Sequence, residues 1–286
     1  MRNHTMSRRS IPMPKVISAD TTVSQLVEYW LQLLRTEARL ELTTINEYER
    51  VLRKLVVPTL GPLTMVELRS SHIDAVLTEL GTRSVNRQRK ARVVTGAMLD
   101  VAVRRGALAA NPVRGSISVP RPKVEHRAVT REDLDRIRAA VQAWAGRGGP
   151  GPKASGDMSD IVDLLLATGA RIGEVLAIRW SDVELERGQA RISGTVKTEP
   201  GRGTHRKPLP EGRTVRLPRF AVEVLRRRLA ERRDMSADAV FPTRNGTWQQ
   251  VNNVERRWRQ IREGADLRWV TPDALRGLLA SADALL

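Results

Sequence analysis

The chain contains no cysteine, which excludes disulfide bonds, zinc sites with thiolate ligands and thiol nucleophiles. No apolar run approaches the roughly 20 residues that a membrane-spanning helix needs, and the basic N-terminus lacks the apolar segment of a secretory signal. Aromatic residues make up only 3% of the 286 residues. The four histidines are scattered without metal-ligand spacing: His4, His72, His126 and His205. We therefore expect a cytoplasmic protein with aliphatic cores and with neither a metal ion nor another cofactor.

Positive charge is what the sequence has in excess. Lys and Arg number 49 and Asp and Glu number 32, which gives a net charge of +17. A surplus of this size attracts polyanions, and it is mainly Arg, whose planar guanidinium matches phosphate oxygens in pairs. Neither a Walker motif nor a GxGxxG loop is present. We expect duplex nucleic acid as the partner, ahead of an anionic membrane surface or a small-molecule cofactor.

Composition and periodicity divide the chain into four segments. Residues 1–19 are predicted to be a basic flexible tail, and residues 20–111 form a block of amphipathic helices. Pro, Gly and basic residues interrupt the periodicity over residues 112–127, which we interpret as a basic linker. Residues 128–286 combine helices with two β-like stretches. The predicted fold class is mainly α with a small β-sheet (α+β), in an N-terminal helical domain and a C-terminal mixed domain.

Local signals place the elements within these segments. The stretch TTINEYERVLRKLVVPTLG predicts a helix capped by Thr43 or Thr44 and ended by Pro58 and Gly61. QARISGTV and RTVRLP predict strands with a polar hairpin between them, and WVTPDALRG predicts a helix capped by Thr271. Further helices are predicted in TTVSQLVEYWLQLLRTEA, SSHIDAVLTEL, SVNRQRKARVVTGAMLDVAVRRG, AVTREDLDRIRAAVQAW, DMSDIVDLLLATGARIGEVLAIRWSDVEL (broken at Thr168-Gly169), PRFAVEVLRRRLAERR and QQVNNVERRWRQIREGADL.

Three stretches carry side chains suited to phosphate chemistry. In ATGARIGEVLAIRWSDV, Gly169 permits a sharp turn and Arg171 starts the next helix, where the guanidinium and the helix N-terminus face one anion. Glu174 lies within reach to orient Arg171. The alternative interpretation is an ordinary Arg–Glu pair on a helix surface, which contributes little.

The other two stretches supply further cations. KTEPGRGTHRKPLPEGRTVRLP carries Lys197 and Lys207, and a lysine on such a hairpin can protonate a leaving oxygen. TPDALRG carries Arg276, a second candidate phosphate ligand. A solvated basic turn and a plain capped helix are the alternative interpretations of these two stretches.

Together these stretches resemble the tyrosine recombinase (phage integrase) family. The resemblance rests on ATGARIGEVLAIRWSDV, on KPLPEGRTVRLP followed by a helix, on VFPTRNGT and on WVTPDALR, and it spans the chain from about residue 20. It implies DNA cleavage and rejoining through a 3′-phosphotyrosine intermediate, without a metal ion. Two arginines would hold the phosphate oxygens, a hairpin lysine would act as general acid, and histidines would assist.

The resemblance assigns these roles to individual residues. Arg171 corresponds to the first arginine and Glu174 to the acidic residue after it. Lys207 corresponds to the hairpin lysine, with Lys197 as the alternative, and Arg276 corresponds to the arginine of the HxxR motif. Asp273 stands at the position of the histidine in that motif, where a carboxylate either pairs with Arg276 or stabilises the start of the helix.

The nucleophile has no counterpart in the sequence. Family members carry their tyrosine well beyond the second arginine, whereas ten residues follow Arg276 here. Tyr29 and Tyr48, in the N-terminal helical block, are the only tyrosines. We therefore expect a C-terminally truncated, cleavage-defective integrase that binds duplex DNA and self-associates on it. The alternatives are an active recombinase that integrates or excises DNA, and a non-enzymatic regulator that binds DNA or RNA.

The predicted DNA-binding residues lie in the Arg-rich fourth helix and in the linker. They are Arg87, Arg89, Lys90, Arg92, Arg121 and Lys123.

Overall fold

The computed structural model describes residues 16–120, 129–145, 157–232 and 238–276. The chain divides into two compact units, residues 1–123 and residues 124–286, named below the N-terminal unit and the C-terminal unit. Each unit has its own hydrophobic core. Arg121 and Lys123, predicted to bind DNA, lie outside the described residues.

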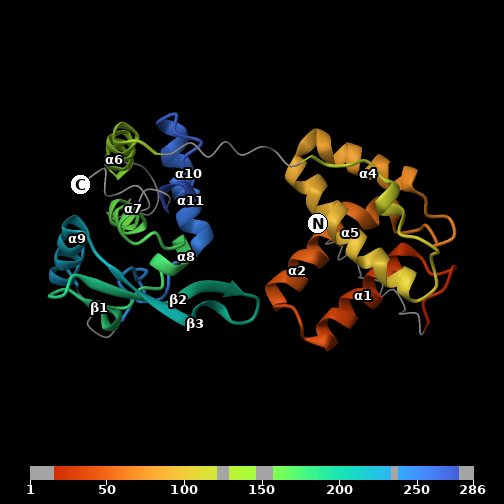
Figure 1. Ribbon diagram of the computed structural model, residues 1–286, viewed down its shortest axis with the longest axis horizontal. Coiled ribbons are helices and arrows are strands. Elements are labelled where there is room, and N and C mark those ends of the chain that lie inside the picture. Colours follow the sequence, from red (N-terminus) through yellow and green to blue (C-terminus); the bar gives the residue numbers. More distant parts are fainter. Residues whose placement is uncertain (1–15, 121–128, 146–156, 233–237, 277–286) are drawn as a thin grey trace, which may run out of the picture. The chain divides into compact units, whose positions relative to one another are not determined.

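Over residues 16–120, every regular element of the N-terminal unit is a helix (Figure 1). Aliphatic side chains from every long helix fill its core, including Leu26, Leu52, Leu77 and Leu99. The Thr22 side chain accepts a hydrogen bond from the Gln25 backbone, which caps the first helix as expected. The elements are α1 (Val23–Glu37), α2 (Leu42–Val51), η1 (Leu52–Val56), α3 (Val57–Leu60), α4 (Ser70–Arg83), α5 (Val85–Arg104) and η2 (Pro112–Gly115).

The second helix departs from the sequence prediction at both ends. It begins at Leu42, so the predicted caps Thr43 and Thr44 lie inside its first turn, and that prediction was wrong. The chain also continues through Pro58 before it stops at Gly61. A proline lacks an N–H group and its ring crowds the carbonyl four residues back. The π-helical turn η1, in which the Val57 N–H donates to Leu52 O, widens the helix just before Pro58 and so accommodates it.

The segment expected to be a linker begins as an ordered part of the N-terminal unit. Val113 is buried in the core, and the Asn111 side chain donates to Gly96 O (2.9 Å) and Asp100 Oδ1 (2.8 Å) on α5. Ser70 Oγ of α4 donates to Pro112 O at 2.8 Å. These contacts fix η2 against α4 and α5, and the division between the two units falls after Lys123.

The pairing of Glu47 with α5 makes the stability of this unit depend on pH. A hydrogen bond from Arg50, together with Lys90, lowers the pKa of Glu47 from 4.5 to about 2, against the opposing effect of burial. The unfolded chain therefore binds a proton that the folded chain does not, and stability falls as the pH drops from about 4.5 towards 2. Because the side chain is one-third exposed, solvent screening reduces the expected loss to about 1 kcal/mol.

Hydrogen exchange of α2 and α5 peptides at pH 5 and pH 3 checks this prediction. E47Q is expected to flatten the difference in protection between the two pH values. E79Q, which alters the exposed pair with Arg83, is the control and is expected to leave the difference unchanged. An equal pH dependence in E47Q and the wild type would contradict the assignment.

The C-terminal unit packs helices around a small antiparallel sheet of strand order β1-β2-β3. Its core collects apolar side chains from all the longer helices and from β2, including Leu165, Val196, Leu225 and Trp258. The elements are α6 (Arg131–Ala145), α7 (Asp157–Thr168), α8 (Ile172–Val175), η3 (Trp180–Asp182), β1 (Val183–Glu184), β2 (Gln189–Glu199), β3 (Gly203–Arg216), α9 (Arg219–Ala230), α10 (Val251–Gly264) and α11 (Pro272–Arg276).

The predicted polar hairpin is mostly strand. β2 and β3 continue pairing as far as Glu199 and Gly203, so the strands are longer than the stretches QARISGTV and RTVRLP predicted, and both candidate lysines lie within them. The register shifts once: Ile192 pairs with Arg213 and Gly194 pairs with Pro208, which leaves residues 209–212 as a bulge in β3. The polar composition of this hairpin hid the pairing, because main-chain hydrogen bonds and not buried side chains hold its outer part.

The fold class is as predicted, mainly α with a small β-sheet. Among the described helices, none is long and apolar enough to cross a membrane.

Candidate phosphate-binding site

A tight turn between α7 and α8 carries the first predicted phosphate ligand. Gly169 adopts a φ of 57°, a conformation that residues with a Cβ rarely take. Thr168 Oγ1 accepts a hydrogen bond from Ala170 N (3.2 Å) and donates to Leu164 O (2.6 Å), which fixes the turn to the last turn of α7. The turn ends at Arg171, and α8 starts at the next residue.

Glu174 holds Arg171, as the sequence predicted. Its Oε2 accepts from the Arg171 backbone N–H at 3.1 Å, and its Oε1 lies 3.3 Å from Arg171 Nη1. The Glu174 side chain is 4% exposed, whereas the Arg171 side chain is 70% exposed. The carboxylate is therefore an internal anchor, and the guanidinium that it orients faces solvent.

Arg276 is anchored on the same turn. Its Nε donates to Gly169 O at 2.9 Å, across 107 residues of sequence, and its Nη1 lies 3.0 Å from Asp273 Oδ1. Thr271 Oγ1 accepts from Ala274 N at 3.1 Å, so the predicted cap of α11 is present. The structure brings Arg276 to the turn that precedes Arg171, and Asp273 forms the i,i+3 pair with Arg276.

Sequence reasoning missed a third arginine at this turn. Arg213 of β3 donates from Nη2 to Glu174 Oε2 at 2.8 Å. Burial alone would raise the pKa of Glu174, but the hydrogen bonds from Arg213 and from the Arg171 backbone outweigh it and lower the pKa. The alternation of β3 could have revealed this residue, because Arg213 is in phase with Val215 and Leu217 and so places a charge on the apolar face of the strand.

The two candidate lysines lie two register positions apart in the β2–β3 ladder. Lys207 of β3 pairs with Thr195, and Lys197 of β2 pairs with His205. Thr195 in turn packs against α8: a Cβ added to Gly173 would lie 2.8 Å from Thr195 Oγ1. Because residues paired across an antiparallel ladder point to the same face, Lys207 shares its face with the residue that contacts α8.

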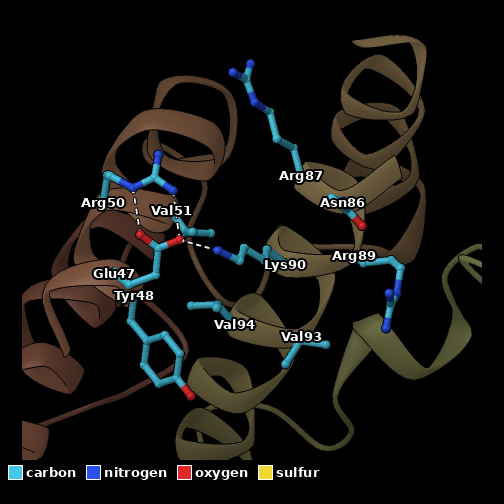
Figure 2. Close-up of a pocket in the computed structure, with 10 residues that line it drawn as sticks. All are labelled: Glu47, Tyr48, Arg50, Val51, Asn86, Arg87, Arg89, Lys90, Val93 and Val94. Carbon is cyan, nitrogen blue, oxygen red and sulfur yellow. Dashed lines mark hydrogen bonds and ion pairs between the residues drawn. The ribbon is translucent and has the colours of Figure 1, made fainter. Parts of the chain in front are cut away.

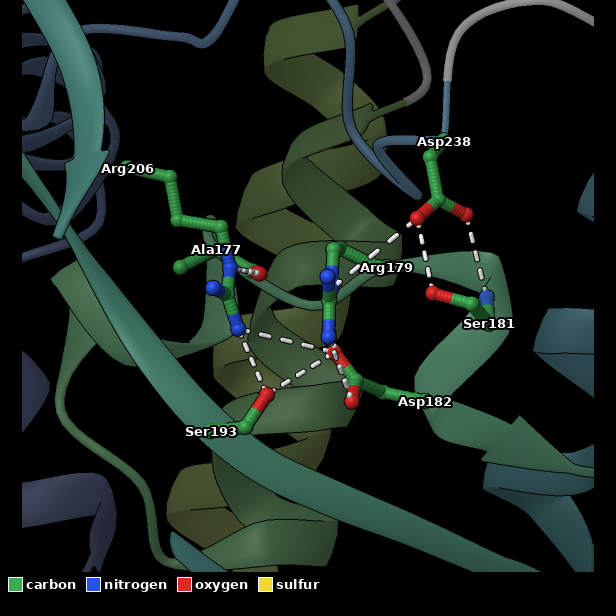
Figure 3. Close-up of polar contacts among 7 residues, drawn as sticks. All are labelled: Ala177, Arg179, Ser181, Asp182, Ser193, Arg206 and Asp238. Carbon is green, nitrogen blue, oxygen red and sulfur yellow. Dashed lines mark hydrogen bonds and ion pairs between the residues drawn. The ribbon is translucent and has the colours of Figure 1, made fainter. Parts of the chain in front are cut away.

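A buried polar network ties the hairpin to the chain after α8 (Figure 3). Arg206 Nε donates to Ala177 O at 3.0 Å, and Arg206 Nη2 donates to Ser193 Oγ at 2.5 Å. Asp182 accepts from Ser193 Oγ at 2.9 Å and lies 3.5 Å from Arg206 Nη2. Arg179 holds Asp182 through two hydrogen bonds, of 2.7 and 3.1 Å. This network fixes the position of the strand segment that carries Lys207.

The basic residues predicted on α5 fall into two groups. The Lys90 Nζ lies 2.5 Å from Glu47 Oε1, and Arg92 donates to the backbone oxygens of Ile117 and Val113, so both hold the unit together. Arg87 and Arg89 line a groove of about 510 Å³ between α2 and α5, and their guanidinium groups point away from Glu47 (Figure 2). Within the described residues, the side chains of Arg87 and Arg89 form no ion pair.

Both tyrosines are partly buried and pack against the core of the N-terminal unit. Tyr48 stacks on Trp30 with ring centroids 5.6 Å apart, and the Arg105 guanidinium lies 5.9 Å from the centre of the Tyr29 ring. In the ranges that the structure describes, no group of three or more His, Asp or Glu side chains is arranged to hold a metal ion.

The C-terminal unit thus brings Arg171, Arg213 and Arg276 to the turn between α7 and α8 and to the start of α8. Residues 129–282 match the phage integrase family. This match covers more than half of the chain, which therefore belongs to that family.

Similar proteins span nearly the whole chain. It is 24% identical to the tyrosine recombinase XerC of Proteus mirabilis over 86% of this chain and 76% of that protein. It is 26% identical to XerC of Alcanivorax borkumensis, over 82% and 71%. The Tn1549 transposon integrase in complex with transposon right end DNA has the same fold, with a TM-score of 0.70, 18% identity, and coverage of 92% and 87%. A lambda integrase tetramer bound to a Holliday junction has a TM-score of 0.66 and is 14% identical, with coverage of 92% of this chain and 73% of that chain.

Proposed function

We propose that this chain binds duplex DNA at a recombination site and holds one phosphate between Arg171 and Arg276. The observation that carries the proposal is the hydrogen bond from Arg276 Nε to Gly169 O, which brings the second arginine to the turn that presents the first. Both guanidinium groups keep most of their five donors for a ligand. The Tn1549 integrase bound to transposon end DNA and the lambda integrase bound to a Holliday junction, which share this fold, support the same partner.

We propose that the remaining predicted cations bind the DNA backbone as well. Lys207, with Lys197 as the alternative, would reach the same phosphate from the hairpin. Arg87 and Arg89 would contact phosphates along α5, with Arg121 and Lys123 further along the chain. Self-association on DNA is part of the proposal, and the lambda integrase dimer and tetramer structures support it.

We further propose that these 286 residues do not cleave DNA by themselves. A phosphotyrosine intermediate needs a tyrosine at the phosphate, and the two that the sequence holds are partly buried and pack against the N-terminal core. Asp273 supplies no proton donor at the position of the family histidine while it is ionised. The chain would occupy its site as a DNA-binding recombination protein.

Affinity for duplex DNA measured over a range of salt concentrations tests the binding proposal. Each phosphate contact contributes about −0.9 to the slope of log affinity against log salt. The double variant R171A/R276A is expected to reduce the magnitude of the slope by about 2. R219A, which removes a 93% exposed arginine of α9, is the control and is expected to change it little. A salt-independent affinity would refute DNA binding through phosphate contacts.

A nicked duplex tests the absence of cleavage. The duplex that the chain binds most tightly, nicked close to the protected region, would trap a covalent intermediate if one formed. We expect no adduct that survives denaturation. An adduct that does would show an active recombinase and would overturn the assignment of Tyr29 and Tyr48 as packing residues.

A further inference from the structure

One short segment carries one guanidinium group and anchors two more from distant parts of the chain. Residues 169–174 include Arg171 itself, the Gly169 carbonyl that accepts from Arg276 of α11, and the Glu174 carboxylate that accepts from Arg213 of β3. The sequence motifs account for the first two arginines. Arg213 is the member of this group to which no motif assigned a role.

The charges around Glu174 leave the site open to an anion. The single buried carboxylate is shared by Arg171 and Arg213, so these three side chains sum to one positive charge. Arg213 gives the carboxylate one hydrogen bond, from Nη2, which leaves most of the five guanidinium donors for another acceptor. An oxyanion beside Arg171 would therefore find a second guanidinium attached to the same carboxylate.

Exposure separates Arg213 from the arginines that only hold the fold. Arg206 and Arg228 are 12% and 14% exposed, and each spends several donors on internal acceptors. Arg213 is 46% exposed, between Arg276 at 32% and Arg171 at 70%. By exposure and by the number of donors engaged, Arg213 groups with the two predicted phosphate ligands.

We propose that Arg213 is a third phosphate-binding arginine of this site, contacting the DNA backbone beside Arg171 while Glu174 holds both guanidinium groups. This inference rests on the proposed function, since it assumes that the ligand of the site is a DNA phosphate. In this proposal Glu174 aligns Arg213 of β3 as well as Arg171, so one carboxylate orients two phosphate ligands from different elements.

The variant R213A tests the contact through the salt dependence of binding to duplex DNA. Loss of one phosphate contact is expected to reduce the magnitude of the slope by about 1 and to weaken binding about 5- to 10-fold near 0.1 M salt. R216A is the matched control, because Arg216 lies on the same strand with its side chain on the opposite face. It removes the same charge and is expected to change the slope by much less.

A second pair of variants separates direct contact from positioning. If Arg213 acted only by neutralising Glu174, its removal would have no effect once Glu174 is replaced by Gln. Direct contact predicts that the slope falls by about 1 between E174Q and E174Q/R213A as well. An unchanged slope in that comparison, or an equal effect of R213A and R216A, would overturn the proposal. Wild-type binding in the same assay would leave the proposed function standing, so the two failures are distinguishable.

Discussion

Replacing Arg228 by alanine is expected to lower the unfolding free energy of the C-terminal unit by about 3 kcal/mol, because it removes a partner of Asp157 and one of the two arginine partners of the buried Asp160. Arg228 Nη1 lies 2.9 Å from Asp157 Oδ1 and 2.8 Å from Asp160 Oδ2. Two further hydrogen bonds reach Val240 O, and the guanidinium lies 4.4 Å from the centre of the Phe241 ring. The side chain of Asp160 is 5% exposed, so water cannot replace what Arg228 provides.

Urea unfolding followed by tryptophan fluorescence measures this effect, since five of the six tryptophans lie in residues 124–286. R226A on the same helix is the control: its partner Glu186 is 93% exposed, and the expected loss is below about 0.5 kcal/mol. In R228A/D160N the loss should be smaller than in R228A, because the side chain at position 160, which keeps only Arg227 of its two arginine partners, no longer carries a charge. Equal losses in R228A and R226A would contradict a buried network.

Replacing Gly194 by alanine is expected to destabilise the C-terminal unit by about 1–3 kcal/mol through overpacking. A Cβ at this position would overlap the guanidinium of Arg206, and Nε and Nη2 of that group would also lie too close. A long side chain normally moves aside at little cost. Arg206 is held by Ala177 O and Ser193 Oγ and is 12% exposed, so it cannot move without breaking these hydrogen bonds.

The double variant G194A/R206A tests whether the cost of G194A comes from the clash with Arg206. Once Arg206 is truncated, the added methyl group has room, and G194A should cost close to nothing in that background. Thermal unfolding of the four proteins of the cycle provides the measurement. G96A on α5 is the control, because a Cβ there meets only ordinary contacts at 3.5 Å or more. Additive losses for G194A and R206A would show that the two residues do not compete for space.

The sequence predicted the elements whose signals are local. Apolar spacing identified the long helices, and side-chain caps such as Thr22 and Thr271 marked where two of them begin. The start of α2 was misplaced because two threonines resembled a cap, although the helix already begins at Leu42. The extended pairing of β2 and β3 was also missed, since no apolar alternation marks the outer part of the hairpin.

The candidate site likewise contains residues that local motifs identified and contacts that they could not predict. Motifs singled out Arg171, Glu174 and Arg276, and the i,i+3 contact between the first two follows from their spacing. The hydrogen bond from Arg276 to Gly169 and the ion pair between Arg213 and Glu174 join residues that are 107 and 39 positions apart. No local pattern encodes such distances, and only the packing of α11 and β3 against the turn determines them.

The separation of Gly169 and Arg276 in the sequence affects how the chain folds during its synthesis on the ribosome. The turn at Gly169 is made early, β3 follows, and Arg276 emerges only after 107 further residues. Closing a loop of this length carries an entropic cost that is recovered only when the intervening core has formed. The growing chain has therefore completed α5 long before Arg171, Arg213 and Arg276 can converge, because their convergence requires α11.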